Sequence, residues 1–416
     1  MEENNISLLT KENENFLHDY LRKLNVTDYK IDVTSATNPG DNYFGIIARI
    51  KIDSQESTLH WIFKAAMQQE KFRLLTGVAE LYKRECYIYS TVFKVFEELQ
   101  MQSGILHQFK SYPKYLTHSL NPPNESIIME DLKVEGYSIH DRFKTLDYNH
   151  VMLAVREYSR FHALSFALRD QKPSLFEEVS KNCQDVLFSN PVMSCEEVID
   201  AANFKFNCIE ETIDGSQKSL YKAFIKAKQD FAFIGLKCTK SGVASKYSVI
   251  CHGDSWNNNL LFQYSNLNNA HAPTSLAIID WQLSRVGSPI LDLTHFLYTC
   301  TDKQFRDKYY HEIIEEYYNT FSSFLRNLGS DPEILFPYSE YEEHLKKYSI
   351  FGLYMAVQIL YLVFSSKDEV PDLHNITSKQ DGLKVLNYRL KNNDMYTTRI
   401  KDIITDFENL GYNLQI

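Results

Sequence analysis

Residues 247–262 read Tyr-Ser-Val-Ile-Cys-His-Gly-Asp-Ser-Trp-Asn-Asn-Asn-Leu-Leu-Phe, and residues 276–282 read Leu-Ala-Ile-Ile-Asp-Trp-Gln. Each stretch contains a short apolar run that leads to a carboxylate, Asp254 in the first and Asp280 in the second. Short apolar runs bounded by turn residues predict buried strands, so both aspartates are expected at strand ends. The loop between them is rich in Asn and Ser, which is typical of a hairpin connection.

Asn259 stands five residues after Asp254 and directly before the apolar residues 260–262. Two carboxylates and a carboxamide are the oxygen ligands that Mg²⁺ prefers when it also binds substrate phosphates. The spacing Asp-x-x-x-x-Asn, followed by a strand that ends in Asp, matches the catalytic and metal-binding parts of kinases. Asp and Asn are also ordinary turn residues, but three of them at matching positions favour the functional interpretation.

The stretch His252-Gly253-Asp254-Ser255-Trp256-x-x-Asn259, with Ile279-Asp280-Trp281-Gln282, resembles the kinases of the aminoglycoside phosphotransferase and choline kinase superfamily. The Trp two residues after the first Asp, and Asp-Trp-Gln in place of Asp-Phe-Gly, resemble its ecdysteroid kinase-like branch, a family best known in insects. This resemblance implies an α+β, bilobal protein-kinase-like fold with a small β-rich N-terminal lobe and a large, mainly helical C-terminal lobe. It implies ATP and Mg²⁺ as cofactors, Asp254 as the catalytic residue, and Asn259 and Asp280 as metal ligands.

A turn-rich stretch at residues 34–45 leads into an expected strand at 46–52, whose residues alternate between apolar and polar faces. The two segments resemble the phosphate-covering hairpin of a kinase, which implies that Gly40, Asn42 and Tyr43 bind the nucleotide. The family pattern is Gly-x-Gly-(Asp or Glu)-Asn-(Tyr or Phe). Its first glycine is missing here, which puts the closure of the loop over the phosphates in doubt.

Lys64 ends a second expected strand at residues 59–64, and Glu85 lies on or near the apolar stripe of an expected helix at 78–98. The resemblance implies that Lys64 contacts the α- and β-phosphates of the nucleotide and pairs with Glu85. The alternatives are a solvated strand end for Lys64 and a boundary charge for Glu85. Lys83 and Arg84 are expected on the surface.

Another short apolar strand at residues 126–129 resembles the hinge strand of the family, which assigns Met129, Glu130 and Leu132 to adenine binding through their backbone groups. We place the lobe boundary there, giving a nucleotide-binding lobe at residues 1–132 and a catalytic and substrate-binding lobe at 133–416. From residue 148 onward the spacing of apolar residues predicts helices. His162 is expected to be a hydrogen-bonded core histidine, and Asp292 a helix N-cap. The resemblance implies that Asp292 also holds the catalytic loop in shape.

The composition of the chain is that of an ordinary globular protein, with 416 residues and a formal net charge of −10. This charge disfavours nucleic acid or an anionic membrane as the main partner. The seven cysteines are scattered and the first residues are acidic, so we expect reduced thiols and a cytoplasmic protein. Residues 348–364 are almost continuously apolar but too few to span a bilayer, so they predict a buried helix. The sequence does not determine the oligomeric state.

These observations predict ATP-dependent phosphorylation of a small-molecule alcohol. The apolar helices expected at 305–328 and 348–364 favour a lipophilic acceptor, and the resemblance points to an ecdysteroid or similar steroid. A kinase that detoxifies other alcohols and a non-catalytic nucleotide-binding protein remain alternatives, as does metal-assisted hydrolysis. A protein kinase is disfavoured because only eight residues separate Asp280 from Pro289, too few for a peptide-binding activation segment.

Overall fold

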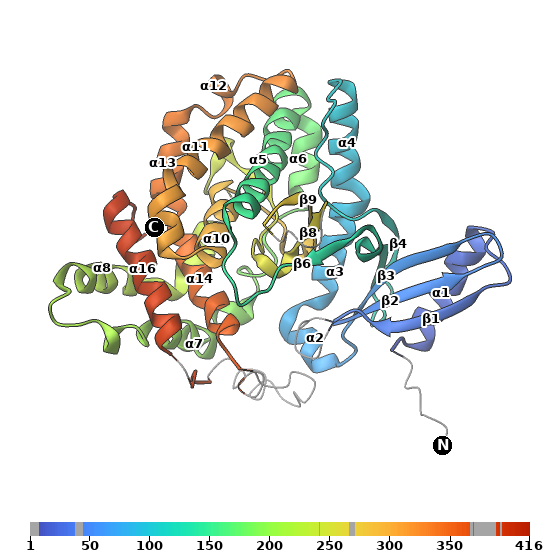
Figure 1. The fold of residues 1–416 in the computed structure, drawn as a ribbon, viewed down its shortest axis with the longest axis horizontal. Coiled ribbons are helices and arrows are strands. Elements are labelled where there is room, and N and C mark those ends of the chain that lie inside the picture. The colour runs from blue at the N-terminus through green and yellow to red at the C-terminus, as the bar shows by residue number, and fades with distance from the viewer. Residues whose placement is uncertain are drawn as a thin grey trace.

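The N-terminal part of the chain forms an antiparallel five-stranded sheet, and most of the remainder is helical (Figure 1). The computed structural model describes residues 8–37, 45–240, 242–265, 271–366, 369, 388–391 and 393–416. The predicted α+β class is therefore confirmed. The proposed lobe boundary at residue 132 stays a prediction.

The large sheet has the strand order β1-β2-β3-β5-β4, and all of its neighbouring strands are antiparallel. Three of the strands were predicted with nearly their observed bounds, two from the alternation of residues along the strand and one from a short apolar run. Its strands are β1 (Lys30–Ser35), β2 (Gly45–Asp53), β3 (Thr58–Ala66), β4 (Tyr115–Ser119) and β5 (Ser126–Glu130).

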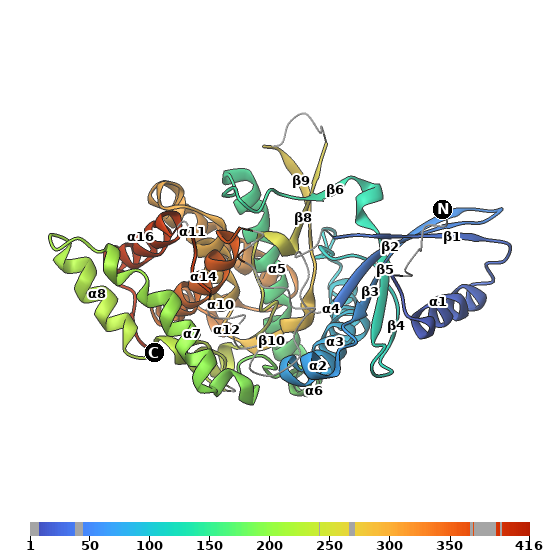
Figure 2. The ribbon, with the colours of Figure 1, turned by 90° about the horizontal axis from the view of Figure 1, so that it is seen from below.

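Helix α1 (Lys11–Lys23) covers one face of this sheet, as Figure 2 shows. The helix begins at Thr10, whose hydroxyl accepts a hydrogen bond from the Asn13 amide at 3.2 Å, a standard N-cap. Leu17 and Leu21 pack against buried side chains of β2, β3 and β5 in a small core of their own. Because side chains alternate along a strand, the other face of β3 carries Lys64.

A long helical stretch connects the sheet to the rest of the molecule. It consists of α3 (Val78–Tyr87), a π-helical turn (Ile88–Val92) and α4 (Phe93–Gln102). The single helix predicted at 78–98 thus has an extra residue in its middle and ends four residues later. Its buried side chains from Cys86 onward belong to the main core of the helical region.

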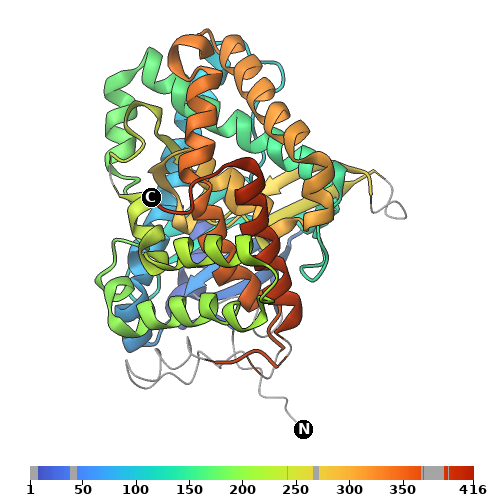
Figure 3. The same ribbon diagram turned by 90° about the vertical axis from the view of Figure 1, so that its left-hand side faces the viewer.

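The helical region is built on two helix pairs, α5 (Tyr148–Gln171) against α11 (Lys303–Asn327) and α10 (Ile290–Cys300) against α14 (Ile350–Val363). The second pair is closely packed, because a Cβ on Gly352 would lie 2.7 Å from the backbone of Thr294. Helix α16, red in Figure 3, lies beside α8 and α14. The other α-helices within the described residues are α2 (Glu70–Thr76), α6 (Pro173–Lys181), α7 (Glu196–Asn207), α8 (Lys218–Lys228), α9 (Ile234–Thr239), α12 (Pro332–Leu335), α13 (Tyr338–Tyr348) and α16 (Asp394–Leu410).

Two small antiparallel sheets carry the predicted catalytic stretch. In one, β6 (Tyr137–Ile139), β8 (Leu260–Tyr264) and β9 (Pro273–Ile278) lie side by side, and β8 and β9 form the predicted hairpin. In the other, β7 (Val249–Cys251) pairs with β10 (Arg285–Gly287). The strand predicted from residue 247 therefore begins two residues later.

All seven cysteines are free thiols. Within the described ranges no helix, α14 included, combines the length and the apolar character needed to cross a bilayer.

Candidate active site

Asp254 lies in the loop that follows β7, and its side chain is held by two neighbours. Its Oδ2 accepts a hydrogen bond from Nε1 of Trp256 at 3.1 Å and another from Nδ2 of Asn259 at 2.8 Å. Gly253 makes this loop possible: its φ is +89°, and a Cβ there would lie 2.0 Å from the carbonyl oxygen of Leu283. The two hydrogen bonds thus fix Oδ2 of Asp254, and Oδ1 can bind a further partner.

The orientation of Asn259 follows from its own hydrogen bonds. Nδ2 also donates to the backbone oxygen of Asp254 at 2.9 Å, so both amide hydrogens are used. The amide oxygen must therefore point the other way. The amide oxygen of Asn259 and the carboxylate of Asp280 are oxygen ligands of the kind that Mg²⁺ prefers. Asp280 itself has φ +64°, a left-handed conformation that non-glycine residues rarely adopt and that is often found at functional sites.

Lys64 joins the large sheet to this loop region. Its Nζ lies 2.8 Å from Oε2 of Glu85 and 2.7 Å from Oδ1 of Asp280. Burial by itself lowers the pKa of Lys64, but the charges of Asp280 and Glu85 outweigh burial, so the pKa is raised. The ammonium is therefore charged at neutral pH. Three residues that the sequence analysis selected from distant segments are thus in direct contact.

The pKa of Asp254 is raised above its ordinary value. Burial is the main cause, and the negative charge of Asp280 is the second. The hydrogen bonds from Asn259 and Trp256 act in the opposite direction. A carboxylate of raised pKa is a stronger base, which suits a group that accepts a proton from an alcohol.

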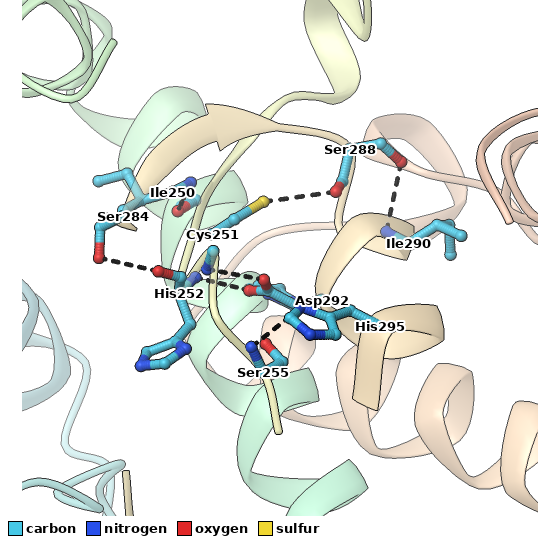
Figure 4. A network of polar contacts seen from close by, with 12 residues as sticks. Ile250, Cys251, His252, Ser255, Ser284, Ser288, Ile290, Asp292 and His295 are labelled. Atoms are coloured by element: carbon cyan, nitrogen blue, oxygen red, sulfur yellow. Dashed lines mark hydrogen bonds and ion pairs between the residues drawn. The ribbon is translucent and has the colours of Figure 1, made fainter. Parts of the chain in front are cut away.

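Asp292 holds the loop that follows β7 in place (Figure 4). Its Oδ2 accepts the amide hydrogen of His252 at 2.6 Å, its Oδ1 accepts that of Gly253 at 2.9 Å, and Nε2 of His162 lies 3.1 Å from Oδ2. Burial alone would raise the pKa of Asp292, but these hydrogen bonds and the neighbouring histidines hold it well below its ordinary range. Asp292 therefore has the predicted loop-holding role.

The prediction that Asp292 is a helix N-cap is wrong. Helix α10 begins at Ile290 with Pro289 at the N-cap, so Asp292 is in the first turn of the helix. Its carboxylate serves the amides of the loop, which lie some 40 residues away in the sequence and so gave no local signal. His162 is a core histidine, as predicted: it is fully buried, with Nδ1 2.7 Å from the hydroxyl of Tyr317.

His252 connects the two aspartate-bearing segments. Its Nδ1 accepts the amide hydrogen of Asp254 at 3.2 Å, so the proton of the neutral ring is on Nε2, which donates to the carbonyl oxygen of Ile279 at 2.9 Å. Ile279 directly precedes Asp280. The imidazole therefore sets the distance between the backbones that carry the two carboxylates.

The predicted hinge residues lie at the end of β5 and directly after it. Met129 and Leu132 are buried, and Glu130 is half-buried. The amides of Glu130 and Asp131 donate to the carbonyl oxygens of Lys114 at 3.0 Å and His60 at 3.1 Å, so these two N–H groups are used within the protein. The side chain of Asp131 forms an ion pair with Arg49 of β2 and caps the turn after the hinge. Adenine binding by this segment remains a prediction.

The other predicted nucleotide-binding residues, Gly40, Asn42 and Tyr43, lie outside the described residues. One expectation about α3 is wrong: Lys83 is exposed, but Arg84 is buried and donates to backbone oxygens. Its position gave a usable signal, because Arg84 is spaced three and four residues from the buried Leu81 and Ile88. Sequence reasoning also assigned no role to His252 or to the indole of Trp256.

The fold and the site define a protein of the kinase-like class, with a buried lysine–glutamate pair facing a loop that carries the catalytic-type Asp and Asn. A sequence profile of the ecdysteroid kinase-like family matches residues 39–330. The chain belongs to the ecdysteroid kinase-like family, which confirms the resemblance noted in the sequence. Among solved structures, it is similar to Plasmodium vivax ethanolamine kinase Pv091845, with 11% identity, a TM-score of 0.39, and coverage of 92% of this chain and 84% of that chain. A search of curated proteins found no match.

Proposed function

We propose that this protein is an ATP-dependent kinase that transfers a phosphate to a hydroxyl of a small molecule. The observation that carries the proposal is the pair of contacts from Lys64 to Glu85 and Asp280, next to an Asp254 that is fixed by Asn259. Phosphoryl transfer needs little covalent help from a protein, so positioned charges of this kind account for most of the catalysis.

Each residue of the site then has a definite role. Asp254 orients the alcohol and accepts its proton on the oxygen that is not bonded to Trp256 and Asn259. The amide oxygen of Asn259 and the carboxylate of Asp280 hold Mg²⁺, and Lys64 contacts the phosphates. Bound magnesium–ATP supplies the phosphoryl group and offsets its negative charge.

The short connection after Asp280 supports a small acceptor rather than a peptide. Residues 281–283 form a single 3₁₀ turn, and β10, which pairs with β7, begins two residues later at Arg285. Only Ser284, Ser288 and Pro289 lie outside these two elements between Asp280 and α10, which leaves no room for a peptide-binding segment. Metal-assisted hydrolysis is a weaker alternative, because it gives the buried pair of Lys64 and Glu85 no purpose.

We further propose a lipophilic alcohol, such as an ecdysteroid or a similar steroid, as the acceptor. Family membership supports this choice. Tyr317 and Phe321, two aromatic residues of the helix predicted at 305–328, are fully buried in the packing of the helical region and do not support it. The remaining support comes from the C-terminal half of α14, where Ile359, Leu362 and Val363 are apolar yet only half-buried. Acceptors such as choline favour aromatic or acidic sites instead.

A panel of alcohols tests the proposal. Purified protein is incubated with magnesium–ATP and a polyhydroxylated steroid, choline or an aminoglycoside, and each acceptor is analysed by mass spectrometry. We expect one added phosphate, with the highest kcat/KM for the steroid. Another lipophilic alcohol as the best acceptor would identify a detoxifying kinase. A clear preference for a cationic acceptor would contradict the steroid assignment, and no product with any alcohol would favour a non-catalytic protein.

A further inference from the structure

Arg84 is a buried arginine next to Glu85 in helix α3. Its side chain reaches away from the sheet, where Nη1 donates to the carbonyl oxygen of Ser284 and Nη2 donates to that of Gln184 at 2.7 Å. Only 7% of the residue is exposed, whereas the side chain of the preceding Lys83 is 65% exposed. Arg84 therefore joins α3 to two segments that are 100 and 200 residues away in the sequence.

Burial of the Arg84 guanidinium costs free energy, and few contacts offset this cost. Arginine is seldom buried without a carboxylate, and no carboxylate lies within ion-pair distance of Arg84 among the described residues. Burial lowers its pKa, and the like charge of Arg285 acts in the same direction. A hydrophobic side chain at this position would avoid these costs but would leave two carbonyl oxygens without their donor.

The two carbonyl oxygens belong to the framework of the catalytic loop. Ser284 comes four residues after Asp280, and its hydroxyl donates to the carbonyl oxygen of His252 at 3.3 Å. Gln184 follows Cys183, whose carbonyl oxygen accepts the amide hydrogen of Val286 in β10 at 2.8 Å. A shift of α3 relative to the loop would therefore break the hydrogen bonds of Arg84.

A second buried arginine, Arg285, binds the same framework. Arg285 donates from Nη2 to the carbonyl oxygen of Gly253 at 2.7 Å, and its Nη1 lies 3.4 Å from Oδ1 of Asp185. Its guanidinium lies over the rings of Phe188 and Phe351. The loop and the segment at 183–185 are thus fixed to each other, which gives Arg84 a rigid surface to bind.

We propose that Arg84 is a positioning residue that fixes helix α3 against the catalytic loop and so keeps Glu85 in contact with Lys64. The inference rests on the proposed function, because its effect is exerted through the phosphate-binding role of Lys64. The hydrogen bonds of Arg84 to Ser284 and Gln184 then hold α3 in place without an activation segment.

A double-mutant cycle on nucleotide affinity tests this inference. The Kd of magnesium–ATP is measured for Arg84→Met in the natural chain and in a Lys64→Met background. If Arg84 acts through Lys64, we expect about a tenfold loss of affinity in the first case and less than about a twofold loss in the second, since residues in one network are not additive. Lys83→Met, an exposed neighbour, serves as the control and should leave the affinity unchanged.

Equal losses in both backgrounds, or no loss with Lys64 present, would overturn the inference. If Arg84→Met does not fold, Arg84→Lys is used in the same cycle, because it retains the charge and one donor; it should give a smaller loss that also disappears without Lys64. Failure of the proposed function looks different: the natural chain would then bind no ATP, or Lys64→Met would bind it as tightly as the natural chain.

Discussion

Nζ of Lys64 lies 2.7 Å from Oδ1 of Asp280, so a cation of the large sheet is paired with a carboxylate that follows a strand of the helical region. The same ammonium also contacts Glu85. Under the proposed function, nucleotide binding must redistribute these contacts: Lys64 turns partly to the phosphates, and Asp280 becomes available to the metal. Asp280 therefore has two competing cationic partners.

This competition predicts the behaviour of Asp280→Ala. The substitution should weaken ATP binding in the presence of Mg²⁺, because a metal ligand is lost. Without Mg²⁺ the affinity should be unchanged or higher, because Lys64 loses a competitor for the phosphates. Titrations of ATP with Mg²⁺ and with a chelator separate the two effects, and Asp200→Ala, at an exposed position of α7, is the control. Equal weakening under both conditions would indicate a structural defect instead.

Asp254→Asn should abolish phosphoryl transfer while leaving the fold and ATP binding almost intact. The new side chain has the same size and retains an oxygen for the hydrogen bonds from Trp256 and Asn259, but it cannot accept the proton of the alcohol. We expect kcat to fall by much more than tenfold, which corresponds to a loss above about 1.4 kcal/mol of transition-state stabilisation. A variant that kept more than about a tenth of the natural kcat would show that Asp254 is not the base.

The raised pKa of Asp254 predicts an acidic limb in the pH profile of kcat/KM. Activity should be lost as the pH falls through this pKa, at a pH above the usual value of about 3.9 for Asp. Trp256→Phe removes a hydrogen bond that lowers the pKa, so it should move the limb to still higher pH. A limb that stays in place or moves to lower pH in this variant would contradict the assignment of the limb to Asp254.

Asp292→Asn should destabilise the protein at neutral pH. It replaces a buried carboxylate that accepts the amides of His252 and Gly253 and contacts His162, so the loss should be on the order of 3 kcal/mol in the free energy of unfolding. The folded-state pKa of Asp292 is depressed, so its stabilisation is complete above the unfolded value of about 3.9 and is lost as the pH falls toward the folded value.

Urea denaturation of the natural chain and Asp292→Asn at several pH values measures this difference. The two should differ by a constant amount between pH 5 and 8, roughly one to four units above the unfolded pKa, and should converge below about pH 4. Asp200→Asn should have no effect at any pH. A difference that persists unchanged in acid would show that the charge of Asp292 is not the cause.

The residues of the candidate site could be selected from the sequence because each belongs to a short-range pattern. Asp254 and Asp280 follow apolar strands, Asn259 has a fixed spacing, and Lys64 and Glu85 belong to an alternating strand and an amphipathic helix. The contact between Lys64 and Asp280, 216 residues apart, was not predicted, because the resemblance paired Lys64 only with Glu85 and assigned Asp280 to the metal.

The supporting residues were not predictable in the same way. The partners of Arg84 and Asp292 are backbone groups, which have no identity in the sequence, so nothing marks them as acceptors or donors for a distant side chain. Several elements were missed for a related reason: β1 is mostly exposed and has only two alternating apolar residues, Ile31 and Val33, and β6 and β10 are three residues long. Such elements are defined by the strands that they pair with.

The most direct test of the proposed reaction is the stoichiometry of products from magnesium–ATP and a polyhydroxylated steroid alcohol. We predict one phosphorylated alcohol for each ADP formed, with neither product from Asp254→Asn. ADP accompanied only by inorganic phosphate, at a rate that the alcohol does not change, would contradict the account and identify a hydrolase.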